Sequence, residues 1–406
     1  MAWWQAIAEG GSAFVTRIGF FGILGSGNLG NDGSLDAVLS HVRERYPDAE
    51  LGFLAMGPEQ LTARYGAPAT HLQWYEPHAG DATGLRAAGL KVLGKLLDPF
   101  RTLAWVRNYD VVIVPGMGVL EATLPLRPWA LPYSLFWLGA TARLTGTRVA
   151  LVSAGADVVR KRATRWVITR AARLAHYRSY RDEHSRQAMA RMGVDVSADA
   201  VFPDLAFGLA DPEPRSSTGA VGVGVMAFHG GNDDRAHADE INRAYLSTVK
   251  RFVRLLADEG RPIRLFTGDV ADDDVPAEII AAVPGADITA EPLTSLQDLM
   301  RRMAEVDVVV ATRYHNVLCA LKTAKPTISL GYARKNDVLM SAMGLGEFCQ
   351  SAREPDFDRL VAQFRELEDR REELTAVLKE RNRVMSERLE RQFAIMSESV
   401  VEGSRT

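Results

Sequence analysis

Cysteine is scarce in this chain of 406 residues, because Cys319 and Cys349 are its only two. This scarcity argues against a secreted fold held together by disulfides and favours a reducing compartment, so we expect a cytoplasmic protein. Cys and His also lack the spacing of a structural zinc site, so we expect no metal centre.

Strong net charge and long uncharged apolar segments are absent too. The net charge of −3 gives no overall reason to expect a nucleic-acid partner.

The N-terminal segment MAWWQAIAEGGSAF lacks the basic region and continuous apolar core of a signal peptide. The most apolar longer window, residues 119–142, contains Glu121, Arg127 and three prolines, whereas a membrane helix needs about 20 largely uncharged residues. Trp3 and Trp4 leave two interpretations, a peripheral membrane contact or a packed or disordered tail, and we favour the tail.

The length of the chain exceeds that of one ordinary core, so two domains are expected. Strand patterns alternate with helical patterns throughout, which predicts α/β domains with mostly parallel sheets covered by helices. The main expected strands are residues 17–24, 51–56, 111–114, 149–153 and 177–180, followed by 221–227, 263–267, 306–311 and 327–330.

We divide the chain at its clearest linker, DPEPRSSTG at residues 211–219. Residues 17–210 and 220–355 are predicted to form two Rossmann-like domains, with tails at 1–16 and 398–406. Residues 356–397 are predicted to be helical, with an apolar stripe along the helix. The stripe either covers the chain's own domains or pairs with a partner helix in a homo-oligomer, and we favour the first alternative.

A glycine-rich turn at residues 22–35 follows the first expected strand. Gly25, Gly27 and Gly30 fit G-x-G-x-x-G, a pattern that places a dinucleotide pyrophosphate at a helix start. The second strand does not end in the acidic residue that would bind the ribose. We therefore favour another anionic or hydroxylated ligand over NAD or a purely structural turn, because the turn also carries Asn28, Asn31 and Asp32.

Two further strand ends carry distinctive residues. Gly116 and Gly118 let the backbone approach either a ligand or a neighbouring strand. Arg181 and Asp182 follow the strand at 177–180, and Asp182 is well placed as the N-cap of the next helix. Capping does not account for Arg181, which we expect to point toward the crevice between the domains.

The stretch from 306 to 337 is the most informative. Arg313 and His315 stand where a buried strand passes into a helix, and helix starts favour anions. Arg334 and Lys335 follow the next strand. Because open α/β sheets bind ligands at the carboxyl ends of their strands, we predict an anion site with an acid/base group here, rather than a structural histidine.

Together these stretches resemble the polysaccharide pyruvyl transferases. That family shows a Gly-Asn-x-Gly-Asp turn, a triple-glycine turn, an Arg-Asp-x-x-Ser element and a Ser/Thr-Arg-x-His helix start, with a basic residue beyond the next strand. The matching positions here are residues 27–31, 115–118, 181–185 and 312–315, and Lys335. The ordered set extends from about residue 18 to about residue 350.

The resemblance implies a GT-B-like fold with its site between an acceptor-side N-terminal domain and a donor-side C-terminal domain. It also implies transfer of pyruvate from phosphoenolpyruvate to a glycan or lipid-linked saccharide, as a cyclic ketal, with phosphate release and no cofactor. His315 would act as acid/base with Arg313. The donor would bind to Arg181, Arg313, Lys335, Arg334 and His229. The acceptor side of the cleft would be lined by Asn28, Asn31, Asp32, Gly116 and Gly118.

Three positions depart from the family pattern. Asn31 replaces an aspartate, Met117 replaces a glycine, and His229 stands where an arginine is usual. Two alternatives therefore stay open: a GT-B-like glycosyltransferase that uses a nucleotide sugar, and a non-catalytic member that binds a saccharide. A lipid-linked acceptor would place the protein at the inner face of the membrane.

Overall fold

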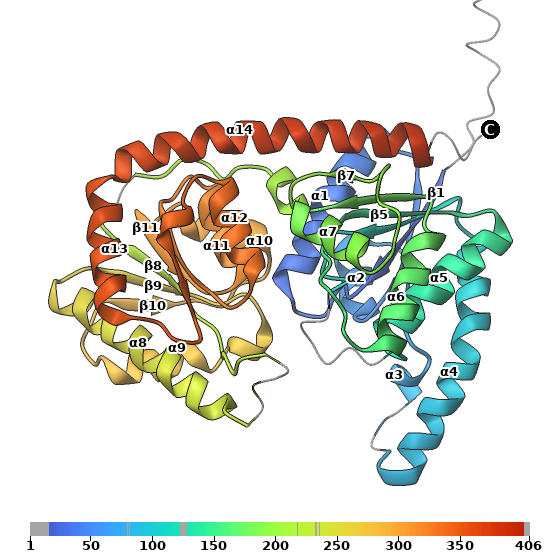
Figure 1. Cartoon of the computed structure of the whole chain (residues 1–406), viewed down its shortest axis with the longest axis horizontal. Helices are drawn as coiled ribbons and strands as arrows, with labels where there is room; N and C mark the ends of the chain where they lie inside the picture. The colour runs from blue at the N-terminus through green and yellow to red at the C-terminus, as the bar shows by residue number, and fades with distance from the viewer. Residues whose placement is uncertain are drawn as a thin grey trace, which may run out of the picture.

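The computed structural model describes residues 16–78, 80, 82–121, 128–216, 218–231, 234 and 236–401. They form two parallel sheets, each covered by helices on both faces (Figure 1). The strand orders are β3-β2-β1-β4-β5-β6-β7 in the first sheet and β10-β9-β8-β11-β12-β13 in the second. In both sheets the first strand along the chain lies near the centre. The order in which later strands are added reverses beside it, as in doubly wound α/β domains.

The N-terminal sheet is built around β1 and β4, whose β-branched and aromatic residues are buried on both faces. Its strands are β1 (Arg17–Gly22), β2 (Glu50–Ala55), β3 (Ala69–His71), β4 (Val111–Pro115), β5 (Arg148–Ala154), β6 (Tyr177–Tyr180) and β7 (Ala200–Val201). Its helices are α1 (Leu29–Arg45), α2 (Pro58–Tyr65), α3 (Tyr75–His78), α4 (Gly84–Val106), α5 (Leu131–Thr145), α6 (Arg162–Leu174), α7 (Glu183–Arg191) and η1 (Leu205–Gly208).

The C-terminal sheet has β8 and β11 at its centre, and both strands are fully buried. Its strands are β8 (Val221–Gly224), β9 (Ile263–Phe266), β10 (Ile288–Ala290), β11 (Val308–Ala311), β12 (Thr327–Gly331) and β13 (Cys349–Ser351). Its helices are α8 (Ala238–Asp258), η2 (Val270–Asp272), α9 (Val275–Ala282), α10 (Leu296–Met303), α11 (Tyr314–Lys322), α12 (Arg334–Ala342) and η3 (Gly346–Phe348).

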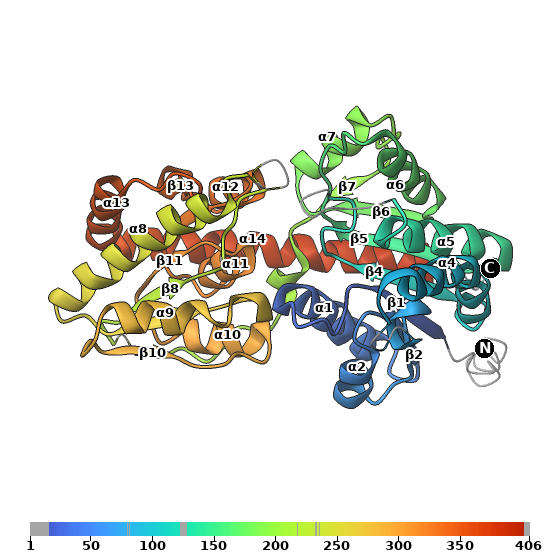
Figure 2. The same ribbon diagram turned by 90° about the horizontal axis from the view of Figure 1, so that it is seen from below.

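Three C-terminal helices follow: α13 (Phe357–Asp369), α14 (Arg371–Met396) and the short η4 (Ser397–Val401). Helix α14 runs across both domains (Figures 1 and 2). Asn382 donates to the backbone oxygen of Leu321 in the C-terminal domain (2.9 Å), and Gln392 donates to Ser179 in the N-terminal domain (2.7 Å). The apolar residues Leu374, Leu378 and Leu389 of α14 are buried, so the stripe packs on the chain's own domains.

Local structure differs from expectation in three places. Helix α1 begins at Leu29 rather than near residue 34, because Asn28 caps it by accepting from the backbone N–H of Asn31 (3.2 Å). Strands β8 and β11 are shorter than predicted. Helix α4 and the edge strands β3, β7, β10 and β13 were not predicted. Trp3 and Trp4 lie outside the described residues, within which no helix is long and apolar enough to cross a membrane.

Candidate active site

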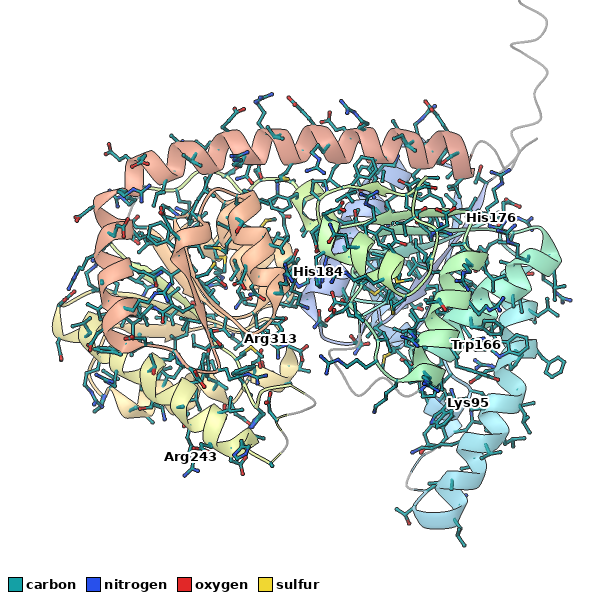
Figure 3. All side chains as sticks on the ribbon, in the orientation of Figure 1. Lys95, Trp166, His176, His184, Arg243 and Arg313 are labelled. Carbon is teal, nitrogen blue, oxygen red and sulfur yellow. The ribbon has the colours of Figure 1, made fainter. Side chains whose placement is uncertain are left out.

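Loops at the carboxyl ends of both sheets meet between the two domains (Figure 3). From the N-terminal domain come Glu121 after β4 and Arg181 after β6. From the C-terminal domain come Tyr314 and His315, in the first turn of α11, and Lys335, in the first turn of α12. We call these five residues the Glu121 cluster. Each of these side chains follows the carboxyl end of a parallel strand, where open α/β sheets bind ligands.

The Glu121 carboxylate joins the two domains. One of its oxygens accepts a short hydrogen bond from Nη2 of Arg181, and the other accepts from Nζ of Lys335 at 3.2 Å. The side chains of Arg181 and Glu121 are only 4% and 7% exposed. Burial by itself would lower the pKa of Lys335, but Glu121 and Tyr332 raise it above its ordinary value, so the lysine stays charged.

Tyr314 lies close to both cations. Its ring centroid lies 4.8 Å from Cζ of Arg181 and 5.6 Å from Nζ of Lys335, within the range of cation–π attraction. Burial raises the pKa of the Tyr314 phenol well above its usual value, so the hydroxyl stays protonated. Asp182 and Asp204 also approach the Arg181 guanidinium, at 3.6 and 3.7 Å. Three carboxylates therefore surround Arg181, and one of them, Glu121, also binds Lys335.

His315 reaches across to the N-terminal domain and lies against Gly30 in the first turn of α1. A Cβ atom built on Gly30 would overlap Nδ1, Cε1 and Cγ of the imidazole, all within 2.5 Å. Burial lowers the pKa of His315 to about 4; Arg181 and Lys335 act in the same direction. In this state the imidazole is neutral at pH 7, rather than titrating near neutrality as expected from the sequence.

Arg313 is engaged within its own domain. Nε and Nη2 donate to the two oxygens of Asp272 at 2.6 and 2.8 Å, a bidentate pair. Asp272 is fully buried and also accepts from the backbone N–H of Ala227 at 3.0 Å. The pair therefore positions the loop after β9. Among the described residues, Nη1 of Arg313 has no hydrogen-bond partner.

The polar residues of the glycine-rich turn mostly hold the turn itself. Asn31 donates to the backbone oxygen of Ile23 (3.1 Å), and Asp32 accepts from the backbone N–H of Gly25 (2.7 Å). Asn28 instead reaches across the domains and donates to Asp269 (2.8 Å). Of the three predicted acceptor-side polar residues, Asn28 is thus the one that faces the C-terminal domain.

The remaining predicted residues divide between the cluster and the surface. Gly118 lies beside Glu121, since a Cβ there would be 2.7 Å from Oε2, whereas Gly116 (φ 55°) forms a tight turn against Ser34. His229 and Arg334 are exposed, and within the described ranges neither forms a hydrogen bond or ion pair with the cluster.

Sequence reasoning missed Glu121, Asp204 and Asp272 as site residues. Glu121 had one visible signal, because it is an isolated acidic residue in an apolar window just past a strand. Asp272 lies in the acidic run 272–274 after β9. Across the described part of the chain, no group of three or more His, Cys, Asp or Glu side chains is arranged to hold a metal ion.

Comparison with known proteins shows the same architecture. Anabaena Alr3699/HepE in complex with UDP-glucose is 13% identical, with a TM-score of 0.59 over 94% of this chain and 99% of that one. The UDP-GlcNAc 2-epimerase of Neisseria meningitidis bound to UDP-GlcNAc is 10% identical, with a TM-score of 0.58 over 96% and 100%. MurG of Acinetobacter baumannii is 12% identical, with a TM-score of 0.53 over 91% and 95%. These matches confirm the predicted GT-B-like fold.

Sequence comparison identifies the family. No curated protein matches the chain significantly. A family model described as "Polysaccharide pyruvyl transferase" matches residues 28–334, which include Glu121, Arg181 and His315. The chain belongs to the polysaccharide pyruvyl transferase family.

Proposed function

We propose that this protein transfers the pyruvyl group of phosphoenolpyruvate to two hydroxyls of a saccharide, forming a cyclic ketal and releasing phosphate. Family membership supports a transferase of polysaccharide biosynthesis. The observation that carries the specific proposal is the convergence of Arg181 and Lys335, from opposite domains, on one carboxylate beside His315.

Glu121 occupies the position that a donor anion would use. Its carboxylate touches both cations, and the donor carries a carboxylate and a phosphate of the same kind. A guanidinium fork binds either group through paired hydrogen bonds, and an ammonium adds a point charge. We infer that the donor displaces Glu121 from Lys335 when the domains separate, and that Nη1 of Arg313 supplies a further contact.

The reaction needs two proton transfers. In the first step, one acceptor hydroxyl adds to C2 of the enolpyruvyl group and C3 gains a proton. In the second step, the bond from C2 to the phosphate oxygen breaks and the second hydroxyl forms the second C2–O bond. Of the two hydroxyl protons, one ends on C3 and the other leaves with phosphate. Neutral His315 suits the first deprotonation, and the donor's negative charge would stabilise the imidazolium that results.

Activity should depend on His315 and not on histidines elsewhere. The test incubates the protein with phosphoenolpyruvate and a glycan acceptor, and follows phosphate release together with the new ketal methyl signal by NMR. We expect His315→Ala to abolish turnover while leaving the fold intact, as circular dichroism would show. The control His237→Ala, an exposed histidine paired with Glu240, should keep full activity. Full activity of His315→Ala would exclude the proposed mechanism.

A nucleotide-sugar transferase is the second candidate, because HepE of the same fold was crystallised with UDP-glucose. A cavity of about 390 Å³ lies beside the ends of β9 and β10. Its described lining includes Asp269, Asp273 and Glu291 and no Lys or Arg, which disfavours a diphosphate. A ligand that binds only the native state raises the melting temperature. A thermal shift with UDP-glucose and none with phosphoenolpyruvate would favour this second candidate, and glycan binding without turnover would favour a non-catalytic member.

A further inference from the structure

Exposed apolar side chains are concentrated in one stretch of the N-terminal domain's sequence. Among the described residues, 13 large apolar side chains are exposed, and nine of them lie between Leu85 and Trp166. Scattered exposed apolar residues are ordinary, but a concentrated patch indicates an interaction site. The nine are Leu85, Val92, Leu93, Leu96, Phe100, Trp129, Leu144, Val158 and Trp166.

Helix α4 carries most of this patch. Leu85, Val92, Leu96 and Phe100 follow one another at intervals of seven and four residues, so they form a single stripe. Phe100 is 72% exposed and Leu85 92%. The helix extends away from the domain on the side opposite α14 (Figure 1). An apolar stripe on a helix normally faces the core, and this one faces outward.

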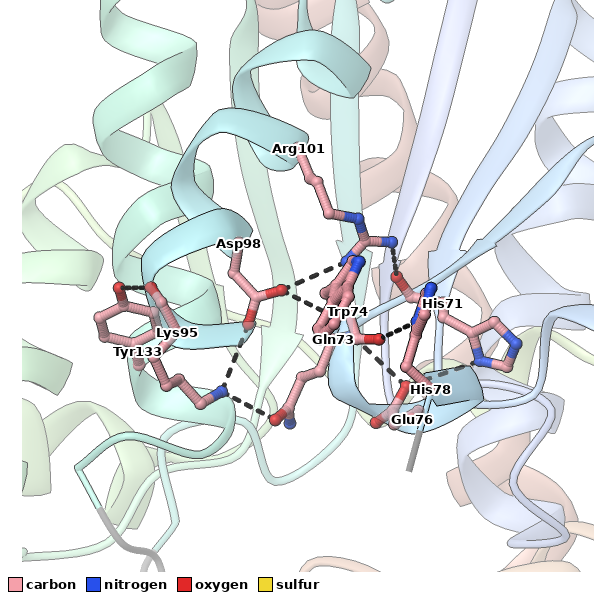
Figure 4. Close-up of polar contacts among 9 residues, drawn as sticks. All are labelled: His71, Gln73, Trp74, Glu76, His78, Lys95, Asp98, Arg101 and Tyr133. Carbon is pink, nitrogen blue, oxygen red and sulfur yellow. Dashed lines mark hydrogen bonds and ion pairs between the residues drawn. The ribbon is translucent and has the colours of Figure 1, made fainter. Parts of the chain in front are cut away.

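A buried polar network fixes the orientation of α4 (Figure 4). Asp98, on the inner face of the helix, accepts from the backbone N–H of Trp74 (2.8 Å), from Arg101 (3.2 Å) and from Lys95 (3.5 Å). Tyr133 of α5 donates to the backbone oxygen of Lys95 at 2.6 Å. Since the inner face is held by these bonds, rotating the stripe inward would break all of them.

Positive charge is concentrated around α6. Residues 158–173 contain six Lys and Arg and no Asp or Glu, although the whole chain has a net charge of −3. Within the described ranges, Arg160, Lys161, Arg162 and Arg165 form no ion pair, so their charges are uncompensated locally. Trp166 is exposed among them, with Cζ of Arg170 at 5.7 Å from its ring centroid.

Helix α5 joins the stripe to the cations. The ring of Phe136 on α5 contacts Trp166 on α6, with centroids 6.1 Å apart. Lys95 and Trp166 lie on the same flank in Figure 3. Helices α5 and α6 follow β4 and β5, so they begin toward the carboxyl edge of the sheet, which also carries Glu121. Helix α5 packs against both α4 and α6, and α4 lies on the side of the domain away from the C-terminal domain (Figures 1 and 2).

We propose that this surface, the outer face of α4 with the N-terminal ends of α5 and α6, binds an anionic lipid membrane. Exposed Leu, Phe and Trp side chains insert at the boundary between headgroups and acyl chains, while Lys and Arg contact lipid phosphates. A second copy of the chain is a less suitable partner for this surface, because a two-fold symmetric contact would place the Lys and Arg side chains of the two copies against one another. Membrane binding does not depend on the proposed reaction.

Vesicle flotation of the purified full-length protein tests the proposal without donor or acceptor. We expect binding to vesicles of phosphatidylcholine with phosphatidylglycerol, weaker binding at high salt, and little binding to phosphatidylcholine alone. Each cation near an anionic surface strengthens binding about fivefold, so R160E/K161E/R165E should weaken it by at least ~100-fold. L96S/F100S should also lose binding, because it removes the apolar insertion.

Matched controls separate this surface from general charge and from misfolding. K379E/R381E/R391E reverses three exposed cations of α14 and should bind nearly as the wild type does; circular dichroism and melting establish that each variant folds. Absence of wild-type binding to the anionic vesicles would overturn the proposal. Unchanged binding of R160E/K161E/R165E would also overturn it. A third contrary result would be that the wild type forms a dimer and does not bind vesicles, and that L96S/F100S dissociates this dimer.

Discussion

Replacing Gly30 with alanine should disable His315 without harming the fold. Gly30 lies in the first turn of α1 with ordinary helical φ, so alanine is compatible with its backbone. The added methyl would overlap the imidazole, whose Cγ lies 2.5 Å from the ideal Cβ position. An ordinary contact begins near 3.4 Å, so the ring must recede by about 1 Å or more.

The expected effects on stability and on turnover have different sizes. Alanine is favoured over glycine inside a helix by up to about 1 kcal/mol, so the melting temperature should change little. A displacement of about 1 Å at a reacting group can lower a rate about 100-fold. We therefore expect a large fall in kcat with a small change in stability.

Gly89→Ala is the matched control. Gly89 is also helical, and a Cβ built there meets nothing within 4 Å. This variant should gain helix stability and keep full activity. Phosphate release measures kcat and KM, and NMR titration of the imidazole gives a readout independent of turnover. Displacement toward solvent should raise the pKa of His315 from about 4 toward its ordinary value. If Gly30→Ala keeps both wild-type kcat and the wild-type titration, the contact between Gly30 and His315 is not important.

Three further changes test the charges of the site. Acidification from about pH 6.5 to about pH 4 should lower stability by up to ~3 kcal/mol relative to His315→Gln, because the unfolded imidazole takes up a proton before the folded one does; parallel urea midpoints for the two proteins would refute this. Arg313→Met should cost roughly 3–5 kcal/mol by leaving the buried Asp272 unpaired, and adding Asp272→Asn should restore part of it; a loss in the urea midpoint that the second substitution does not reduce would contradict the pairing. Glu121→Gln should lower the melting temperature of the free protein by weakening its contacts with both cations, and should increase the rise produced by phosphoenolpyruvate; a smaller rise would show that Glu121 does not compete with the donor.

The central strands were predictable because parallel strands buried on both faces are continuous apolar runs. Residues 111–114 and 306–311 are of this kind. The edge strands β3, β10 and β13 have three residues each, too few for a recognisable period. Helix α4 was missed because its apolar residues lie on the outer face as well as the inner one. The start of α1 was missed because its first turns contain Gly30 and Gly33, which are weak helix formers.

Site residues at strand ends could be proposed from local sequence, and their partners could not. Arg181, His315 and Lys335 each follow a strand, which a single chain reveals. The significance of Glu121 depends on Lys335, 214 positions away, and only the folded chain brings them together. The protonation state of His315 was unpredictable for the same reason, because burial at the domain interface, against Gly30 of α1, lowers its pKa.

The two arginines of the candidate site differ in whether their contacts lie within one domain or across the interface between the domains. Arg313 is paired with Asp272 of its own domain, so this pair persists whether the domains are open or closed. Arg181 packs on Tyr314 of the opposite domain, and its partner Glu121 also binds Lys335 across the interface. Separation of the domains would free Lys335 and one face of Arg181 together, and burial would then no longer hold His315 neutral. A donor anion that enters would replace Glu121 between the same two cations, and closure around it would rebuild the cluster with substrate in place of a side chain.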